Sequence, residues 1–239
     1  QETRVAVEEA RKNVAKSINC LDREIFFTSG GTESDNWILQ GIAFGNQTKG
    51  KHIITSAIEH HAVLDTCKYL AKNGFEVTFL PVNSKGIVEL SELKKAIRKD
   101  TILISIMYAN NETGMIQPIK EIGEYLKTLE QRIYFHSDAV QVLGKISIDV
   151  KELNVDALSF SGHKIYGPKG VGALYLRLGT KLDAFMHGGY QEKNRRAGTE
   201  NVAGIVGFGK ACEKIEESIQ DYQTRIKKLK EKLYVKLTT

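Results

Sequence analysis

The sequence predicts an α/β fold in which a mostly parallel, seven-stranded sheet carries helices on both faces, giving three α/β/α layers. Two observations predict this fold. Short runs rich in β-branched and aromatic residues alternate with helical patterns along the chain, and no internal repeat or low-complexity linker interrupts the alternation. With 239 residues, of which 41% are hydrophobic, the chain can bury one large core.

The strands are expected where short apolar runs end in polar or glycine-containing segments. By this criterion the strands are residues 25–28, 52–56, 75–80, 102–107, 132–137, 156–160 and 171–177.

Helices are predicted between these strands, where apolar residues recur every three or four positions. Residues 1–20 are helix-like, with Val7, Ala10, Val14 and Ile18 on one side, and they lack the pattern of a signal peptide. The further helices are expected at residues 32–46, 62–73, 90–99 and 118–130.

Residues 210–239 are predicted to form one long amphipathic helix. Its lysines contribute much of the formal charge of +5. We interpret them as the solvated face of a packed helix rather than a nucleic-acid or membrane surface, since no aromatic-rich basic groove accompanies them. The apolar side of this helix is Ile215, Ile219, Tyr222, Ile226, Leu229, Leu233 and Leu237.

The composition narrows the class of protein further. No apolar stretch is long enough to span a bilayer, so no membrane partner is expected. Cys20, Cys67 and Cys212 lie far apart in the sequence. This spacing argues against a disulfide framework or a zinc site and is typical of a protein of the reducing cytoplasm.

A hydroxyl, an imidazole and an amine follow the strand-like run 156–160 directly, as Ser161, His163 and Lys164. A lysine amine acts as a nucleophile only after it loses its proton, so it needs a site that promotes this loss. We consider Lys164 a candidate for a Schiff base with an aldehyde cofactor whose phosphate the same segment would bind. The alternative is a solvated loop lysine.

A second candidate is Asp138, which lies where another apolar run gives way to a loop. Pyridoxal phosphate (PLP) enzymes need a carboxylate beside the pyridine nitrogen, because it keeps that nitrogen protonated and the ring electron-withdrawing. Gln141 lies about one helical turn further on and could donate to the phenolic oxygen of the cofactor. The alternatives are a turn or cap residue for Asp138 and a surface side chain for Gln141.

A phosphate cradle is predicted where the strand 25–28 passes through Gly30 and Gly31 into a helix. The glycines allow close approach of the backbone, and the amides and dipole of a helix start favour an anion. Thr32 and Asp35 could also form a capping box at the same helix terminus.

Six segments together carry a family resemblance that exceeds the specificity of any single motif and covers nearly the whole chain. They are residues 30–34, 59–65, 110–114, 136–141, 159–170 and 196–201. On these segments the chain resembles the cysteine desulfurases of the NifS and IscS type, PLP enzymes of fold type I in the class V aminotransferase group.

The resemblance implies a role for each matching side chain around the ring of the cofactor. Lys164 would form the imine with PLP, Asp138 would pair with the pyridine nitrogen, and Gln141 would bind the phenolic oxygen. His60 would stack on the ring and could assist proton transfer, and Asn111 would lie by the cofactor and the substrate carboxylate.

The resemblance also implies how the phosphate is held. Gly31, Thr32, Ser161 and His163 would bind it within one subunit. Thr199 would reach the phosphate of the other subunit's cofactor, so a homodimer is expected and a monomer would have incomplete sites.

Some of these residues have simpler interpretations. Glu59, His60 and His61 could suggest a metal site, but no His-Glu-x-x-His spacing or cysteine pair supports one, and no metal is expected. Asn111 could be a turn residue, and Thr199 could cap a following helix.

The sequence departs from the family pattern in what it lacks. In the resembling enzymes the catalytic cysteine and the arginine that binds the substrate carboxylate lie well beyond the lysine, and none of the three cysteines here matches that position. We therefore expect residues 1–209 to be the PLP-binding large domain of a longer enzyme. Residues 210–239 would lead toward a C-terminal small domain absent from this chain.

For the longer enzyme the resemblance implies conversion of L-cysteine to L-alanine, with the sulfur left as an enzyme persulfide. The sulfur would pass to an iron-sulfur scaffold or another acceptor protein for cluster assembly or thiolation. Little turnover is expected from the chain alone, because the sulfur-accepting loop is missing.

Two other functions remain open at this point. A selenocysteine lyase or another class V aminotransferase-like PLP enzyme would keep the lysine and the aspartate. Alternatively, the chain could be a non-catalytic dimerisation or partner-docking module, which would not need PLP.

Overall fold

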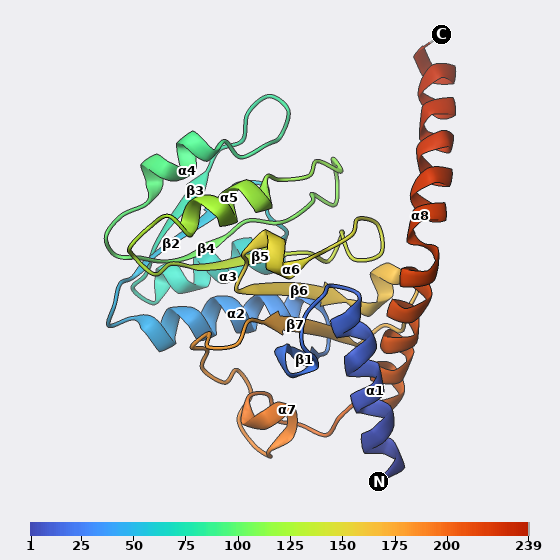
Figure 1. The fold of residues 1–239 in the computed structure, drawn as a ribbon. Coiled ribbons are helices and arrows are strands. Elements are labelled where there is room, and N and C mark those ends of the chain that lie inside the picture. The colour runs from blue at the N-terminus through green and yellow to red at the C-terminus, as the bar shows by residue number, and fades with distance from the viewer. Residues whose placement is uncertain (239) are drawn as a thin grey trace.

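The sheet and its helices are seen in a computed structural model, which describes residues 1–238 (Figure 1). Seven strands form one sheet in the order β1-β7-β6-β5-β4-β2-β3. Only β7 runs against its neighbours, since it pairs antiparallel with β1 and β6 while the other pairs are parallel. The strands are β1 (Ile25–Thr28), β2 (His52–Ser56), β3 (Glu76–Leu80), β4 (Thr101–Ser105), β5 (Tyr134–Asp138), β6 (Ala157–Ser161) and β7 (Gly172–Leu176).

The helices divide the core into two layers, one on each face of the sheet. Neighbouring residues of one strand point to opposite faces, so Ile53 of β2 joins the cluster under α2 and α3, whereas Ile54 joins the cluster on the other face. The helices are α1 (Glu2–Lys16), α2 (Gly31–Asn46), α3 (His61–Lys72), α4 (Leu90–Ala96), α5 (Ile119–Leu126), α6 (Val150–Leu153), α7 (Gln191–Asn194) and α8 (Val202–Thr238), with 3-10 turns η1 (Asp22–Glu24) and η2 (Gly162–Ile165). The predicted mostly parallel, three-layer α/β fold is confirmed.

The predicted strand boundaries hold to within two residues, and two of them, 25–28 and 52–56, match completely. Helix ends are less accurate. The helix predicted at 90–99 stops at Ala96, because Ile97 adopts an extended conformation and the chain already enters β4 at Thr101.

The C-terminal helix begins at Val202, so residue 210 lies inside a continuous helix rather than at its start. Glycines hide this first part from the sequence pattern, because they have low helix propensity. They are required by close packing: a Cβ at Gly209 would lie 2.5 Å from the Cα of Ala10 in α1, and one at Gly207 would lie 2.6 Å from Pro168.

The second half of α8 extends away from the sheet (Figure 1). Its predicted apolar side is present, but Leu229, Leu233 and Leu237 are more than half exposed. Within residues 1–238 no helix combines the length and the apolar character needed to cross a membrane.

An ion pair closes the free edge of the sheet at β1. Arg11 of α1 donates two hydrogen bonds of 2.8 Å to the carboxylate of Glu192 and one of 2.9 Å to the carbonyl oxygen of Ile25. Glu192 in turn accepts the backbone N–H of Phe27. Both side chains are 3% exposed, so the pair satisfies edge groups of β1 in a position that water does not reach.

We predict that the substitution Arg11→Met lowers the free energy of unfolding by about 3–5 kcal/mol, because it leaves the Glu192 carboxylate buried without its partner. Urea unfolding followed by circular dichroism measures this change. The matched control is Arg98→Met, which breaks an exposed pair with Glu76 and Asp100 and should cost less than about 1 kcal/mol. Equal losses of unfolding free energy in the two variants would contradict a stabilising role for the buried pair of Arg11 and Glu192.

Candidate functional site

A cavity of about 280 Å³ lies at the carboxyl ends of β5 and β6, beside the start of α2. Open α/β sheets form ligand sites at this edge, and the volume is close to the roughly 300 Å³ lower end of small-molecule sites. Its lining residues are Gly31, Thr32, Asp35, His60, Met107, Asn111, Asp138, Val140, Gln141, Ser161, His163 and Lys164.

The structure brings together nine of the ten predicted site residues in this one cavity; the exception is Thr199. Asp138 and Ser161 are buried and form the floor, because they are the last residues of their strands. His60 and Lys164 are exposed and lie at the rim. The cavity is therefore closed below and open to solvent above.

The strand-to-helix turn at Gly30 leaves the first turn of α2 open toward the cavity. Gly30 has φ +155°, a conformation that favours glycine, and as N-cap it makes no side-chain capping hydrogen bond. A Cβ at Gly31 would lie 2.5 Å from a methyl group of Val140. Because α2 begins at Gly31, Thr32 and Asp35 lie inside the helix and do not form a capping box.

Beside the start of α2, Ser161 and His163 share a hydrogen bond of 2.9 Å between Oγ and Nδ1. Partial burial and the charges of Lys164 and Lys169 lower the pKa of His163. A helix start, a hydroxyl and an imidazole thus line the same part of the cavity, and such groups bind phosphate.

His60 and Asn111 reach the rim from the ends of β2 and β4. His60 is the N-cap of α3, and its Nδ1 accepts the N–H of Ala62 at 3.1 Å, so a neutral ring carries its proton on Nε2. The turn is held by Asn110, whose Oδ1 accepts the backbone N–H groups of Glu112 and Thr113. Asn111 therefore is not the residue that builds the turn.

Asp138 is a carboxyl group in an unfavourable environment. Burial raises its pKa, and the N–H of Val140 at 2.9 Å and the charges of His60 and Lys164 oppose this effect. The pKa of Asp138 is raised overall, so the protein alone does not fully offset the cost of burying this negative charge. A cation bound against Asp138 would supply the missing compensation.

Asp35 and Glu59 are buried acids whose importance the sequence did not indicate. Asp35 lines the cavity with one oxygen unpaired, and burial together with Asp138 raises its pKa well above the ordinary value. Glu59 accepts hydrogen bonds from Ser56 Oγ at 2.6 Å and Met107 N–H at 2.8 Å. The position of Glu59 within a matching segment was the available signal, but burial cannot be read from it.

A buried histidine, His136, lies behind the floor of the cavity. Its ring nitrogens bond to the hydroxyls of Ser105 at 2.9 Å and Ser159 at 3.0 Å, and its Nε2 is 3.6 Å from Asp35. Burial lowers its pKa to about 3, so the ring is neutral at physiological pH. His136 therefore brings no positive charge to Asp35.

Thr199 lies outside the cavity, in a separate hollow of about 180 Å³. The loop that carries it is anchored to the start of α2, because Arg196 donates hydrogen bonds of 2.7 and 3.0 Å to the two oxygens of Glu33. Thr199 is exposed and does not line the cavity.

The three cysteines are not at the cavity, and all three thiols are unpaired. Burial raises the pKa of Cys67 and of Cys212 to about 12 and raises that of Cys20 as well. Thiols with raised pKa values are poor nucleophiles. Among residues 1–238, no group of three or more histidine, cysteine or acidic side chains is placed to hold a metal ion.

Comparison with known proteins gives one family for the whole chain. The family model of class-V aminotransferases matches residues 1–239. The chain is 60% identical to a cysteine desulfurase IscS of Methanosarcina thermophila over 228 residues and 59% identical to one of Dictyoglomus turgidum over 231 residues. These matches cover 95% and 97% of the chain but only 56% and 57% of the relatives.

Solved structures agree with the fold. A NifS-like protein superposes with a TM-score of 0.96 at 46% identity, over 99% of this chain and 65% of that chain. The crystal structure of DndA from Streptomyces lividans superposes with a TM-score of 0.93 at 39% identity. This match covers 100% of the present chain and 68% of DndA. The chain thus spans a little over half the length of the curated relatives it matches.

We predict that stability depends on pH through Glu59. Burial raises the pKa of Glu59 from 4.5 to about 8, so between these values the folded state holds a proton that the unfolded state has lost. Stability should therefore fall as pH rises through this window, by up to about 1.4 kcal/mol per pH unit.

The substitution Glu59→Gln should flatten this slope, which urea unfolding between pH 5 and 8 measures. The exposed Glu121 of α5 offers a matched control, because Glu121→Gln should leave the slope as it is. An unchanged slope in Glu59→Gln would show that Glu59 does not carry the buried proton.

Proposed function

The chain belongs to the class-V aminotransferase family, and on this premise we propose that it is the cofactor-binding large domain of a PLP-dependent cysteine desulfurase. The observation that carries the proposal is the placement of Lys164 and Asp138 on one cavity whose other side is a phosphate cradle. The identities of 59% and 60% with IscS cysteine desulfurases support the choice of reaction.

The residues present fit PLP at both of its charged ends. The undercompensated carboxyl group of Asp138 suits a protonated pyridine nitrogen. The open helix start at Gly31, together with Ser161 and His163, suits the phosphate. An aldehyde carbon between these ends would lie toward Lys164, the amine of the cavity lining.

When bound, PLP supplies an electron sink that withdraws charge from the α-carbon of an amino acid. The chain's own residues bind and orient. Asp138 would hold the ring nitrogen, Gln141 would face the phenolic oxygen, and Asn111 would meet the substrate carboxylate. The Lys164 amine, once free, would take up the α-proton at Nζ, and His60, with a proton on Nε2, would assist proton transfer from the rim.

The proposed substrate is L-cysteine, and the products are L-alanine and a protein-bound persulfide sulfur. The three cysteines of the chain are away from the cavity and have raised pKa values. We therefore assign the sulfur-accepting thiol to a segment outside these 239 residues. The recipient would be an iron-sulfur scaffold or another sulfur acceptor protein.

The proposal includes a homodimer in the cytoplasm. Thr199 supports the dimer, because it is exposed on an anchored loop and does not line the cavity of its own subunit. A second subunit could receive its hydroxyl. The three unpaired cysteines support a reducing compartment.

We predict that the purified chain, mixed with PLP, develops the visible absorbance of a lysine adduct. Borohydride should fix the adduct on Lys164, as peptide mass spectrometry shows, because that amine lies on the cavity. Lys164→Ala should show neither signal, whereas Lys169→Ala, which removes an exposed lysine outside the cavity lining, should retain both. Loss of cofactor binding in the native chain would contradict the proposal and favour a docking module.

We predict that Asp138→Asn weakens PLP binding by about 10- to 100-fold, since a hydrogen bond to a charged group contributes roughly 1.5–3 kcal/mol. Fluorescence titration with PLP measures the dissociation constant. The exposed Asp221 on α8 provides the control Asp221→Asn, for which the native value is expected. An unchanged dissociation constant in Asp138→Asn would contradict the pairing of Asp138 with the ring nitrogen.

A further inference from the structure

Lys145 is a charged side chain next to the cavity that the proposed function does not use. It lies on the loop between β5 and α6, and its Nζ donates a hydrogen bond of 3.0 Å to the backbone oxygen of Gln141 and one of 3.3 Å to its side-chain Oε1. Partial burial and the nearby Lys164 lower the pKa of Lys145. The contact to Oε1 is the informative one, because Gln141 lines the cavity.

The donor chemistry of lysine decides which way the amide of Gln141 faces. An ammonium group can only donate hydrogen bonds, whereas a glutamine side chain has a carbonyl oxygen that accepts and an amino group that donates. The oxygen must therefore face Lys145, which leaves the amino group for the cavity. A ligand atom opposite Gln141 must then be an acceptor.

We propose that Lys145 is a positioning residue that fixes the side-chain amide of Gln141 so that its amino group donates into the cavity. The inference rests on the proposed function and deepens it. The acceptor would be the phenolic oxygen of PLP, which would accept this hydrogen bond best in its ionised form. Lys145 thus selects the ionised form of that oxygen without touching it.

The backbone that carries Lys145 is held by α8. Gln223 of α8 donates a hydrogen bond of 2.7 Å to the backbone oxygen of Lys145. The preceding Gly144 has φ +75°, and a Cβ there would lie 2.6 Å from Ile215 of α8. The loop therefore fits closely against the helix.

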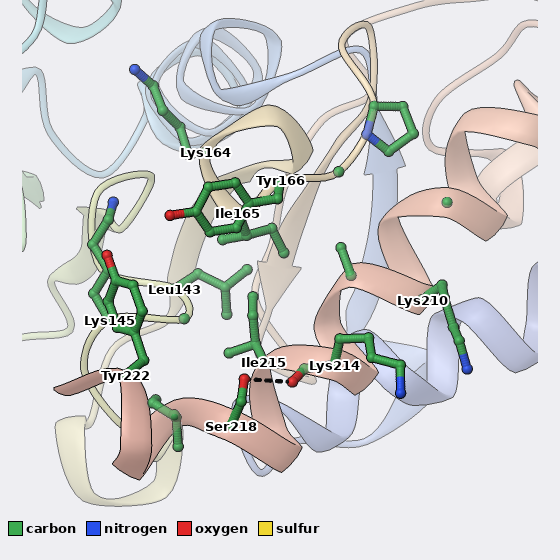
Figure 2. Close-up of a pocket in the computed structure, with 16 residues that line it drawn as sticks. Leu143, Lys145, Lys164, Ile165, Tyr166, Lys210, Lys214, Ile215, Ser218 and Tyr222 are labelled. Carbon is green, nitrogen blue, oxygen red and sulfur yellow. Dashed lines mark hydrogen bonds between the residues drawn. The ribbon is translucent and has the colours of Figure 1, made fainter. Parts of the chain in front are cut away.

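This loop lines a groove of about 680 Å³ between α8 and η2. Figure 2 shows Leu143, Lys145 and Tyr222 among the side chains that line the groove. Lys164 also lines the groove, but its amine points away from α8. The two lysines therefore have different environments, because Lys164 lines both the groove and the cavity, whereas Lys145 lines the groove alone.

The test uses the full chain loaded with PLP and a pH titration of its visible absorbance. Lys145→Met and Gln141→Leu should each raise the midpoint by about half to one pH unit, because losing a hydrogen bond worth roughly 1 kcal/mol makes the phenolic oxygen hold the shared proton more tightly. Lys145→Arg keeps a donor and should stay near the native midpoint. Lys210→Met removes an exposed lysine of the same groove, paired with Glu213, and should also stay there.

The double variant separates an effect through Gln141 from a direct effect of charge. If Lys145 acts through Gln141, adding Lys145→Met to Gln141→Leu should not shift the titration midpoint any further. A full additional shift in the double variant would mean that Lys145 acts directly on Lys164, and no shift in Lys145→Met would mean that it does not act at all. Either result overturns the proposal.

A second measurement needs no cofactor. In the PLP-free chain, nuclear magnetic resonance should find the side-chain amide of Gln141 ordered in the native protein and mobile in Lys145→Met. An ordered amide in a chain that binds no PLP would contradict the proposed function while the orientation of Gln141 stands. A mobile amide in the native chain would overturn the positioning role itself.

Discussion

Burial of the Asp138 carboxyl group at the end of β5 is the constraint on which the candidate site depends. A buried carboxylate needs a compensating charge or enough donors. Asp138 has the N–H of Val140 and the more distant charges of His60 and Lys164, and its pKa is still raised. Asp35 beside it and Glu59 below have raised pKa values for the same reason, burial. The floor of the cavity thus favours a bound cation, which a protonated ring nitrogen would be.

The parallel sheet is what brings the rest of the site to this carboxyl group. β5 and β6 pair in parallel with Asp138 opposite Ser159, so the residues after both strands emerge at the same edge. Lys164 follows in η2, directly after β6. The antiparallel β7 and the edge strand β1 place the start of α2 against the same edge. Side chains far apart in the sequence therefore surround one cavity, and α8 reaches it through the loop that carries Lys145.

The sequence predicted those features that depend on local patterns. Hydrophobic runs predicted the strands to within two residues, and the residues that follow them pointed to Lys164, Asp138 and the glycine turn before α2. His60, Asn111 and Thr199 were expected only from the family resemblance, and the first two line the cavity. Long-range packing was beyond such reasoning. The buried pair of Arg11 and Glu192 joins residues 181 positions apart. The glycines that let α8 approach α1 obscured the start of α8 in the sequence pattern. Asp35 has the sequence position of a capping residue, but it lies buried within α2.

A crystal structure of the chain with PLP would show whether the Asp138 carboxylate pairs with the ring nitrogen. We expect the pyridine nitrogen within hydrogen-bond distance of the Asp138 carboxylate, with the phosphate at the start of α2 and continuous density from the cofactor to Lys164 Nζ. A cofactor bound with its phosphate toward Asp138, or with its ring nitrogen facing solvent, would contradict this pairing.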